Sequence, residues 1–509
     1  MPSRIYSCAL SGIEAYEVEI EVDILQGLSL FTVVGLGDTA VQEAKERVRS
    51  ALMNSGAEFP RQRKVVNLAP ADTKKCGPAF DLPIAVGLLV ESEQIPRESS
   101  CDALFMGELA LDGTVRHTNG ILAAALFAKE RGFKALFVPE IDAKEAHLVS
   151  DLMIFPVQNL AQLISHLRKE ALIEPLLMSQ ELLTKKNGDL PLGLSLFSHI
   201  RGSDLALRSL AISASGGHHL LMSGPPGAGK TLLARHLPLL LPPLSEEECI
   251  ELTKIYSAAG LLSPKRPIIT DRPFRSVHHT ASVVSLVGGG SIIRPGEISL
   301  AHRGVLFLDE IPEFQRSVLE TLRQPLEEKQ VTISRSSGTA TFPSNFIFIA
   351  AMNPCPCGFW GDDQRKCRCS TSDRKHYSQR LSGPLLDRID LFVEMRRLTF
   401  EEMQSKQPLD GRTLYLQILQ ARKIQRKRFQ DPLMLNSLMT PAQLRKFCEV
   451  DDSCLELLKD AVDHHFLSAR GYSRVLKVAR TLADMEKSEL IQQPHLLEAL
   501  GYRKREENP

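Results

Sequence analysis

One eight-residue run constrains the fold of this chain more than any other feature. It has the pattern G-x-x-x-x-G-K-[ST] and consists of Gly224, Pro225, Pro226, Gly227, Ala228, Gly229, Lys230 and Thr231. The apolar run His219–Ser223 precedes it, and the helical run Leu232–Leu241 follows it. Glycines let backbone N–H groups curl around phosphate oxygens, and the following helix points its N-terminus at the same anion. The run therefore predicts a nucleotide-phosphate site between a parallel strand and a helix.

A second apolar run ends in two acidic residues and is predicted to lie beside the first. Val305–Leu308 reads as a buried parallel strand, and Asp309 and Glu310 follow at the edge where ligands of such sheets bind. We expect Lys230 to reach the β- and γ-phosphates of ATP, and Thr231 and Asp309 to hold Mg²⁺. Glu310 is expected to polarise the attacking water. ATP and Mg²⁺ are thus the predicted cofactors.

Further positions are candidates for contact with the γ-phosphate. The predicted strand Phe346–Met352 ends at Asn353, whose amide can position the water, although an Asn after a strand is also a common turn former. Arg388 is a candidate arginine finger for a neighbouring subunit, or else a surface arginine paired with nearby aspartates. Arg470 and Arg474 both begin a predicted helix near the C-terminus, and either can serve as a second sensor.

Periodicity divides the chain into four parts. Its 509 residues suffice for about three domains. Residues 1–170 mix predicted strands and helices, and residues 171–198 form a predicted linker interrupted by prolines and a glycine. Residues 199–395 alternate apolar strands with helices, which is typical of a parallel α/β sheet, and residues 396–509 show only helical periodicity.

Charge and hydropathy exclude other classes of protein. The 61 Lys and Arg residues balance 61 Asp and Glu residues, so binding of nucleic acid through bulk charge is not expected, whereas a local basic track remains open. The densest basic run, residues 422–428, is expected to be a solvated helix face rather than a phosphate contact. The apolar runs are much shorter than the about 18 residues of a membrane-spanning helix, and no targeting segment is visible. We expect a cytoplasmic protein without membrane contact.

Four of the ten cysteines form two close C-x-C pairs. These cysteines are Cys355, Cys357, Cys367 and Cys369. Four thiolates suit tetrahedral Zn²⁺, and a turn-rich loop such as this one can fold around a metal. Reduced loop thiols, or disulfides formed on oxidation, are the alternative. The spacing favours one structural Zn²⁺.

Taken in order, these motifs resemble those of AAA+ ATPases, and more narrowly those of the magnesium-chelatase-like group. The narrower resemblance rests on residues 272–280, 288–290 and 295–302. The whole chain is similar to the ComM/YifB family, bacterial proteins implicated in DNA branch migration during natural transformation. That resemblance implies a P-loop parallel-sheet core with a C-terminal helical lid, in a ring-shaped, hexameric homo-oligomer. The family pattern assigns its roles to Lys230, Asp309, Glu310, Asn353, Arg388 and Arg470, with Arg474 as the alternative second sensor.

Residues 1–170 resemble an α+β, S5-type protease domain of the Lon kind that lacks its catalytic pair. Residues 75–79 align with the segment that carries the nucleophilic Ser, but position 79 is Ala79. Residues 119–122 resemble the segment with the catalytic Lys, but position 122 is Leu122. A Ser–Lys dyad needs a hydroxyl and a base within reach. We therefore expect a protease-inactive domain that supports assembly or DNA contact.

The favoured function is an ATP-driven DNA motor, a helicase or branch-migration translocase on single-stranded or branched DNA. By resemblance to related motors, two insertions face the ring axis: residues 282–299 with Arg294, and the predicted hairpin 329–344 with Lys329 and Arg335. A ring repeats each cation in every subunit, so a neutral chain can still offer a positive track. The alternatives are a chelatase-type motor for metal insertion and a nucleotide switch without motor activity. An ATP-dependent protease is disfavoured by the missing dyad.

Overall fold

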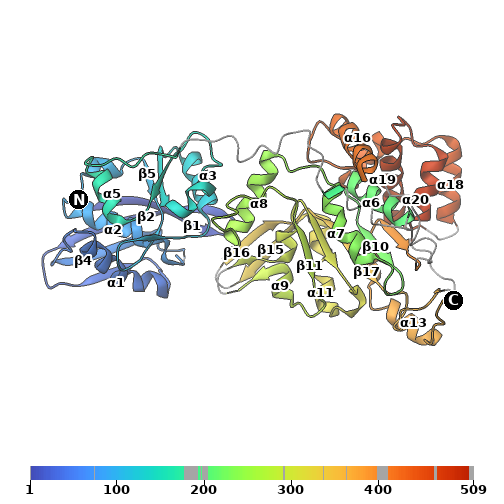
Figure 1. Ribbon diagram of the computed structural model, residues 1–509, viewed down its shortest axis with the longest axis horizontal. Coiled ribbons are helices and arrows are strands. Elements are labelled where there is room, and N and C mark those ends of the chain that lie inside the picture. Colours follow the sequence, from blue (N-terminus) through green and yellow to red (C-terminus); the bar gives the residue numbers. More distant parts are fainter. Residues whose placement is uncertain are drawn as a thin grey trace.

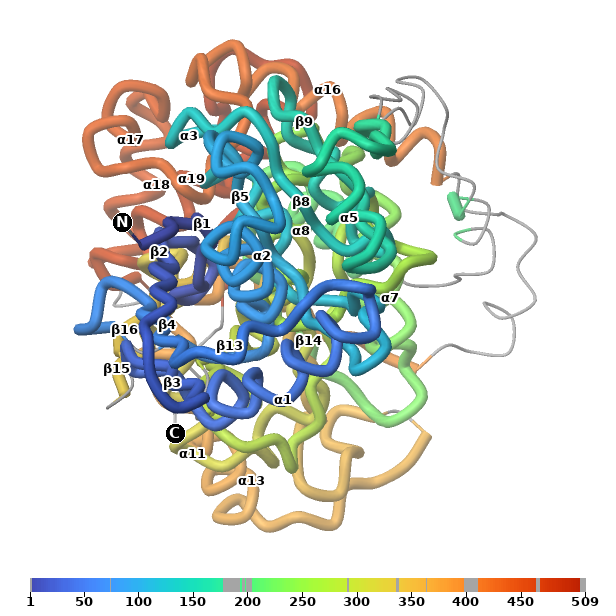
Figure 2. The backbone as a smooth tube through the Cα atoms, turned by 90° about the vertical axis from the view of Figure 1, so that its left-hand side faces the viewer, coloured from blue at the N-terminus to red at the C-terminus, as the bar shows by residue number. Residues whose placement is uncertain are grey.

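The computed structural model describes residues 2–73, 75–176, 193–194, 197, 204–290, 293–335, 338–362, 364–397, 411–463 and 467–503. Three bodies follow one another along its longest axis: an N-terminal α+β domain, a central sheet domain and a C-terminal group of helices (Figure 1). Figure 2 looks along that axis with the N-terminal domain in front. Most of the expected linker lies outside the described residues, and so does the segment 200–203. No helix within the described ranges has both the length and the apolar character needed to cross a membrane.

The N-terminal domain is built on a mixed seven-stranded sheet of order β3-β4-β2-β1-β5-β8-β9. Its strands are β1 (Ser3–Ser11), β2 (Glu14–Leu25), β3 (Phe31–Val34), β4 (Arg63–Ala69), β5 (Ala103–Phe105), β8 (Ala135–Pro139) and β9 (Met153–Val157). A small pair, β6 (Glu108–Leu109) and β7 (Val115–Arg116), stands apart from it. The helices are α1 (Thr39–Asn54), α2 (Asp81–Glu91), α3 (Ile121–Arg131), α4 (Ala143–Ala146) and α5 (Leu160–Leu167). Alternating buried side chains hold the long strands and α2 in one apolar core.

The central domain contains a five-stranded sheet of order β11-β14-β17-β10-β18, and every pair in it is parallel. Its strands are β10 (Leu220–Ser223), β11 (Phe274–Val277), β14 (Val305–Leu308), β17 (Ile347–Met352) and β18 (Leu391–Glu394). The longer helices are α6 (Asp204–Gly216), α7 (Lys230–Leu240), α8 (Glu246–Ala258) and α13 (Thr371–Ser378), with the short α11 (Arg316–Glu320), α12 (Arg323–Glu328) and α14 (Gly383–Leu386) between them. The carboxyl ends of β10, β14 and β17 therefore meet at one edge, which is where the sequence motifs place the phosphate site.

Both expected insertions form short antiparallel pairs. The first contains α9 (Val283–Val287), β12 (Gly288–Gly289), β13 (Arg294–Pro295) and α10 (Glu297–Leu300). The second is the predicted hairpin, with β15 (Gln330–Arg335) paired to β16 (Gly338–Pro343). Its apolar side chains are buried together with Ile13 from the turn between β1 and β2. The N-terminal domain thus packs on one face of the hairpin.

A polar contact also joins the N-terminal domain to α8. The backbone N–H of Gly120 donates to Oγ of Ser257 at 2.8 Å, and that hydroxyl donates to the buried carboxylate of Glu145 at 2.5 Å. Burial raises the pKa of Glu145 to about 7, against the hydrogen bonds from Ser257 and the backbone. At the exposed rim, Nζ of Lys254 lies 2.7 Å from a carboxylate oxygen of Glu14. The two domains are therefore docked by specific contacts as well as by apolar burial.

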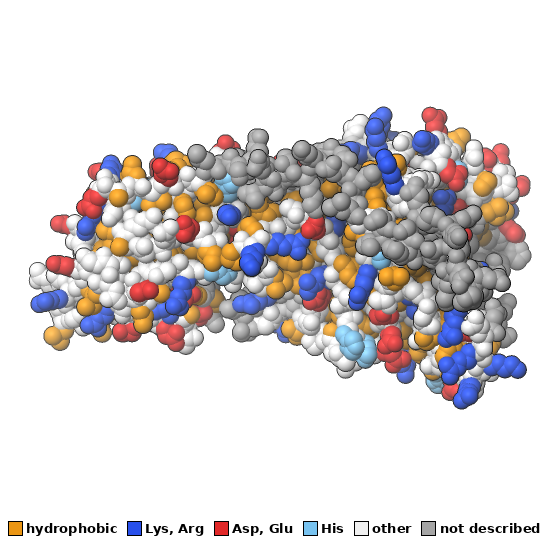
Figure 3. Space-filling view, in the orientation of Figure 1, with side chains coloured by type: hydrophobic (Ala, Val, Ile, Leu, Met, Phe, Trp, Pro, Cys, Tyr) orange, Lys and Arg blue, Asp and Glu red, His pale blue; other side chains and the backbone are white. Residues whose placement is uncertain are grey.

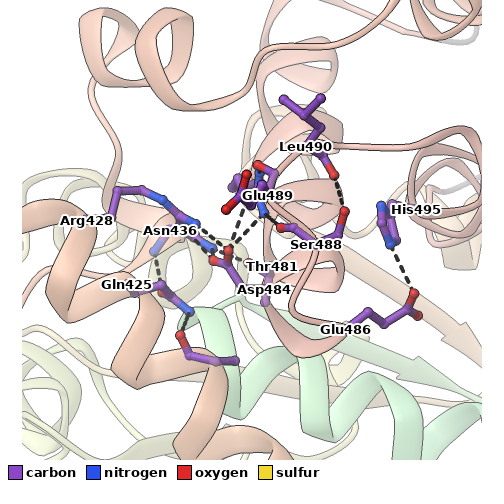
Figure 4. A network of polar contacts seen from close by, with 12 residues as sticks. Gln425, Arg428, Asn436, Thr481, Asp484, Glu486, Ser488, Glu489, Leu490 and His495 are labelled. Carbon is purple, nitrogen blue, oxygen red and sulfur yellow. Dashed lines mark hydrogen bonds and ion pairs between the residues drawn. The ribbon is translucent and has the colours of Figure 1, made fainter.

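The C-terminal helices are α16 (Gly411–Phe429), α17 (Pro441–Phe447), α18 (Asp452–Asp463), α19 (Ala469–Met485) and α20 (Gln493–Gly501). Their centre is a buried polar network around Asp484 (Figure 4). Asp484 accepts hydrogen bonds from Arg428 on α16, from Asn436 at 2.8 Å and from Arg480 at 3.1 Å. Because a carboxylate at 0% exposure needs such partners, the network fixes how α16 packs on α19.

This network corrects one expectation from the sequence. The basic run 422–428 is not a wholly solvated face. Arg428 is paired with Asp484 at 2.7 Å, and Nε of Arg422 donates to the carbonyl of Ala214 at 2.8 Å. Arg426 and Lys427 are exposed, as expected. Charge density alone could not show which cations of the run face a buried acceptor on another element.

Candidate functional site

The phosphate-binding loop connects β10 to α7, as the motif predicts. Gly227 and Gly229 have φ values of 84° and 87°, a left-handed conformation that favours glycine, and Gly229 caps α7. The side chain of Lys230 turns back toward this loop. Its ammonium donates to the carbonyls of Gly224 and Pro225, and to Oδ1 of Asn353 at 3.1 Å. The structure thus brings together three of the predicted nucleotide-site elements.

The electrostatics of Lys230 fit a bound anion. Burial lowers the pKa of its ammonium, while Asp309 and Glu310 act in the opposite direction. Its three hydrogen-bond acceptors are uncharged oxygen atoms. A buried cation is stabilised far more by a charged partner than by neutral oxygens. The β- and γ-phosphates of ATP supply such a partner, so the loop fits the predicted nucleotide.

The predicted Mg²⁺ ligands lie next to each other at the ends of α7 and β14. Oγ1 of Thr231 donates to Oδ2 of Asp309 at 2.7 Å, and the backbone N–H of Glu310 donates to Oδ1 of the same residue at 2.9 Å. A hydroxyl and a carboxylate are ligands that suit Mg²⁺. Glu310 has φ 50° and ψ 45°, a left-handed conformation that costs a non-glycine residue about 1 kcal/mol. The Glu310 side chain that follows this turn is 55% exposed.

The structure adds a residue that none of the sequence motifs assigns to the site. His279 follows β11, the edge strand beside β14, and its Nδ1 lies 3.9 Å from Oε2 of Glu310. Its ring lies against that of His278, with centroids 4.1 Å apart and planes inclined by 34°. The sequence shows no acidic residue near this His pair, because the partner follows a different strand. Only the parallel pairing of β11 with β14 brings His279 near Glu310, at a distance longer than a hydrogen bond. We expect His279 to act as a positioning residue for that carboxylate.

The predicted arginines gather at the opposite edge of the sheet, away from the phosphate loop of the same subunit. The backbone N–H of Asp390 donates to the carbonyl of His219, which precedes β10, whereas the phosphate loop follows β10. Nη2 of Arg388 lies 2.6 Å from Glu327, and its Nε donates to the carbonyl of Arg323 at 3.1 Å. Across a strand of this length the two edges are on the order of 10 Å apart. In this arrangement Arg388 does not serve the phosphate loop of its own subunit.

Arg470 and Arg474 differ in their surroundings, although they share the start of α19. Arg474 pairs with the buried carboxylate of Asp390 and donates to the carbonyl of Arg388 at 3.0 Å. Arg470 is 61% exposed and lies 3.7 Å from Glu327, the carboxylate that also holds Arg388. Arg470 is therefore the accessible arginine of the two, and Arg474 joins α19 to the sheet.

The two insertions lie side by side. A Cβ placed on Gly289 of β12 would lie 3.4 Å from Nη2 of Arg335 on β15, and Arg335 and Arg294 are both exposed. The outer face of the hairpin carries hydroxyl groups, with Thr332 and Thr341 hydrogen-bonded at 3.1 Å. Arg294, Arg335 and the hydroxyl groups of the hairpin thus form a polar surface, while Val283 and Val284 of the first insertion are also exposed.

Lys329 does not belong to this surface, which corrects the expectation from the sequence. Its ammonium turns inward, donates to the carbonyl of Leu326 at 2.8 Å and lies 3.3 Å from Nε2 of His219. Burial lowers the pKa of Lys329 to about 8. The residue follows α12 in a left-handed turn, so its side chain points back to the sheet rather than along the hairpin.

The four cysteines of the two C-x-C pairs converge. Their sulfur atoms all lie within 4.8 Å of one another, and all four thiols are free. The Sγ atom of Cys355 is 3.3 Å from that of Cys357 and 3.7 Å from that of Cys367. Four ligands around Zn²⁺ with Zn–S bonds of about 2.3 Å have sulfur separations of about 3.8 Å. The donor set and its spacing therefore fit Zn²⁺.

A parallel sheet in this strand order, a phosphate loop after β10 and paired acids after β14 define an AAA+ P-loop ATPase core. Family models agree with this class. The model for magnesium chelatase subunit ChlI matches residues 196–403, and the model for its C-terminal part matches residues 410–503. A further model, for subunit ChlI of Mg-chelatase, matches residues 20–142 in the N-terminal domain.

Full-length relatives narrow the family. The chain is 41% identical to the competence protein ComM of Haemophilus influenzae over 507 residues, which cover 98% of this chain and 97% of that protein. It is 39% identical to the uncharacterized protein YifB of Escherichia coli over 504 residues, or 98% and 97% of the two chains. The chain therefore belongs to the ComM/YifB family of magnesium-chelatase-like AAA+ proteins, a class that implies ATPase activity with ATP and Mg²⁺.

Part of the chain is also similar to part of a Lon protease. The chain is 29% identical to Lon protease of Rhizobium meliloti over 159 residues, which are 29% of this chain and 20% of that protein. At the positions expected for a Ser–Lys dyad, the structure has Ala79 and Leu122. Leu122 is buried at 0% exposure, in an apolar cluster under α3. These two side chains offer neither a nucleophile nor a base.

The contact between His279 and Glu310 predicts a kinetic effect. Replacing His279→Ala should lower kcat for ATP about ten-fold, because the carboxylate loses a neighbour that orients it toward the water, with little change in nucleotide affinity. Steady-state ATPase assays and binding of a fluorescent nucleotide measure the two quantities. His278→Ala is the matched control and should retain most of the activity. Equal kcat in the His279→Ala variant and the parent protein would remove the positioning role.

Proposed function

We propose that this protein is a ring-forming DNA motor that couples ATP hydrolysis to strand movement, such as branch migration. The single observation that carries this proposal is the division of the ATPase machinery between two edges of one sheet. Lys230 and Glu310 lie at one edge, and Arg388 and Arg470 lie at the other. A subunit arranged in this way gains a complete site from a neighbour. Repetition of that contact closes a ring, for which we propose six subunits.

The chemistry of each site follows from its side chains. Bound MgATP supplies the scissile phosphoanhydride bond. Lys230 and the loop amides hold its phosphates, and Glu310 orients the attacking water and accepts its proton. Asn353, hydrogen-bonded to Lys230 at 3.1 Å, is positioned to report the γ-phosphate. The neighbour's Arg388 would neutralise charge that develops during transfer, with Arg470 beside it.

The surface made by the two insertions supports DNA as the partner. Arg335 and Arg294 are exposed, and hydroxyl groups cover the outer face of the hairpin. Arginines and hydroxyls are common phosphate ligands. The N-terminal domain covers the opposite, apolar face of the hairpin through Ile13. The polar face is therefore free to line a ring axis and to contact single-stranded or branched DNA.

The name of one relative indicates the biological process in which the proposed motor acts. One full-length relative carries the name competence protein, so we assign the motor to DNA processing during natural transformation, in the cytoplasm. A chelatase motor shares the core and the C-terminal helices. It is the second candidate, because all three matching family models bear that name. A nucleotide switch without hydrolysis is disfavoured, because Glu310, Thr231 and Asp309 are the residue types that hydrolysis of MgATP requires.

The function is tested by the ATPase rate with single-stranded DNA, forked DNA or a porphyrin. Forked or single-stranded DNA should raise the rate, and Glu310→Gln should abolish turnover while it retains bound ATP. In Arg335→Ala, DNA should no longer stimulate the ATPase rate. The slope of the logarithm of the DNA-binding constant against the logarithm of the salt concentration should become shallower by about 0.7 for each phosphate contact that is lost. Arg426→Ala, on the exposed face of α16, is the control and should behave as the parent protein.

Two results would overturn this function. Stimulation by porphyrin and not by any DNA would favour the chelatase motor. A rate that no DNA changes, with unaltered DNA affinity in both Arg335→Ala and Arg294→Ala, would remove the insertions from the DNA path.

We also propose that Cys355, Cys357, Cys367 and Cys369 hold one structural Zn²⁺. Protein purified without chelators should contain about one Zn²⁺ per chain, and Cys367→Ser should lose it. Elemental analysis measures the zinc content, and a thiol-reactive dye measures the number of free thiols in the same sample. Cys101→Ser, which removes an exposed cysteine elsewhere, should leave the zinc content unchanged. Folded, active protein without metal would contradict the site.

A further inference from the structure

The loop between Asn353 and the end of α13 carries more than the four cysteines. We call residues 355–378 the cysteine loop. It projects from the central domain, below the C-terminal helices, at the lower right of Figure 1. Lys and Arg side chains gather over it in the space-filling view (Figure 3). The catalytic assignments above use none of these cations.

The exposed rim of the cysteine loop is cationic. Its basic residues are Arg365, Lys366, Arg368, Arg374 and Lys375. All of them are exposed except Arg374, which is half-buried. The two acidic residues that the structure describes here are engaged locally. Asp362 is 2% exposed and lies 3.2 Å from Nε of Arg397, and Asp373 caps α13 through Ser370.

Two aromatic residues of the loop are paired with arginines. Trp360 is 45% exposed, and the guanidinium carbon of Arg374 lies 3.4 Å from its ring centroid. The guanidinium carbons of Arg365 and Arg397 lie 4.3 Å and 5.3 Å from the ring of Phe359. The guanidinium of Arg374 packs on the ring of the exposed Trp360, and further cations surround the pair. Single-stranded nucleic acids stack their bases on aromatic surfaces of this kind.

The loop also contacts the phosphate loop. Gly358 has φ 83°, and a Cβ placed on it would lie 2.8 Å from Cδ of Pro226, so no larger residue fits without a shift. Cys355 follows Asn353 by two residues, and Asn353 is hydrogen-bonded to Lys230 at 3.1 Å. A displacement of the cysteine loop by a ligand can therefore reach the nucleotide site in two ways. One is through the backbone to Asn353, and the other is through the packing of Gly358 on Pro226.

We propose that the cysteine loop is a second contact for single-stranded DNA, separate from the two insertions. Lys366, Arg368 and Lys375 bind phosphates, and a base stacks on Trp360. Occupancy is transmitted to the phosphate loop through the packing of Gly358 on Pro226. This inference rests on the proposed DNA-motor function and on a loop closed by Zn²⁺. The alternative role for these cations is to balance the charge of four thiolates around the metal.

The chain offers a direct probe, because Trp360 is its single tryptophan. Intrinsic fluorescence of the full-length, zinc-containing protein with the Glu310→Gln substitution and ATP is titrated with a 20-nucleotide oligo-dT. Binding of the same oligonucleotide, fluorescently labelled, is followed by anisotropy. We expect saturable quenching of Trp360 and roughly ten-fold weaker binding in Trp360→Ala, the loss expected for one stacked base.

Charge variants separate DNA contact from charge balance. Lys375 lies on α13, outside the cysteine pairs, and is changed in Lys375→Glu. The double variant Lys366→Gln/Arg368→Gln changes the residue before Cys367 and the residue between Cys367 and Cys369. Both should weaken oligo-dT binding and flatten its salt slope by about 0.7 per lost contact. Zinc content, measured on each variant, should match the parent protein. Arg426→Glu/Lys427→Glu, two adjacent exposed cations on α16, is the matched control and should bind as the parent does.

Other outcomes overturn the inference, and they are distinct from failure of the motor function. Labelled oligo-dT that binds while Trp360 fluorescence and the loop variants stay unchanged would leave the motor intact and exclude the loop. Loss of zinc in the charge variants with unchanged binding would assign the cations to the metal. Quenching by poly-glutamate that equals quenching by oligo-dT would identify an acidic protein as the partner instead. Absence of any oligo-dT binding in the parent protein would overturn the motor function itself.

Discussion

The common direction of five strands determines where every catalytic group of this protein lies. Strands β10, β14 and β17 all end at one edge of the sheet. Their parallel direction is therefore enough to bring together the residues that follow them, namely the phosphate loop, Asp309, Glu310 and Asn353. Because the strands are parallel, the segments that precede β10 and β18 lie at the opposite edge, and Arg388 lies there with them. The residues predicted for the two halves of a hydrolytic site therefore lie at opposite edges of one sheet. This separation is the basis of the proposed assembly.

Ion pairs hold the edge strand β11 and the first insertion in place. Arg272 pairs with Glu248 on α8 at 3.0 Å, and Arg275 pairs with Glu297 at the start of α10 at 2.5 Å. The first pair is largely buried and the second is half-buried, so the loss of either partner would leave a poorly solvated charge. They give a physical reason for the signature that marks the magnesium-chelatase-like group. With β11 fixed, His279 stays beside Glu310, and the insertion that carries Arg294 begins only a few residues later.

Local signals in the sequence predicted the fold best where one periodicity or one motif dominates. The hairpin 329–344 was predicted closely, because alternating apolar residues and a turn define it locally. The strand β1 was not predicted, since buried serines such as Ser3 and Ser7 obscure its alternation. The phosphate loop and the paired acids were predicted from their residues alone.

Contacts between distant elements could not be predicted in the same way. The partner of His279, the inward turn of Lys329 and the different surroundings of Arg470 and Arg474 all depend on which strands are neighbours. Spacing along a sequence carries no information about that pairing. The convergence of four cysteines was predicted, because C-x-C spacing keeps each pair together. The packing of their loop on Pro226 was not, since a glycine shows its neighbour only in the fold.

The central claim is that each ATPase site is completed by the next subunit, and a mixing experiment tests it most directly. Lys230→Ala removes the phosphate half of a site, and Arg388→Ala removes the finger half. Each variant alone should be nearly inactive. In mixed rings, about a quarter of the interfaces would join an intact Lys230 to an intact Arg388, so the ATPase rate should return to about that fraction of the parent rate. Mixed rings that form and yet stay inactive would contradict the account.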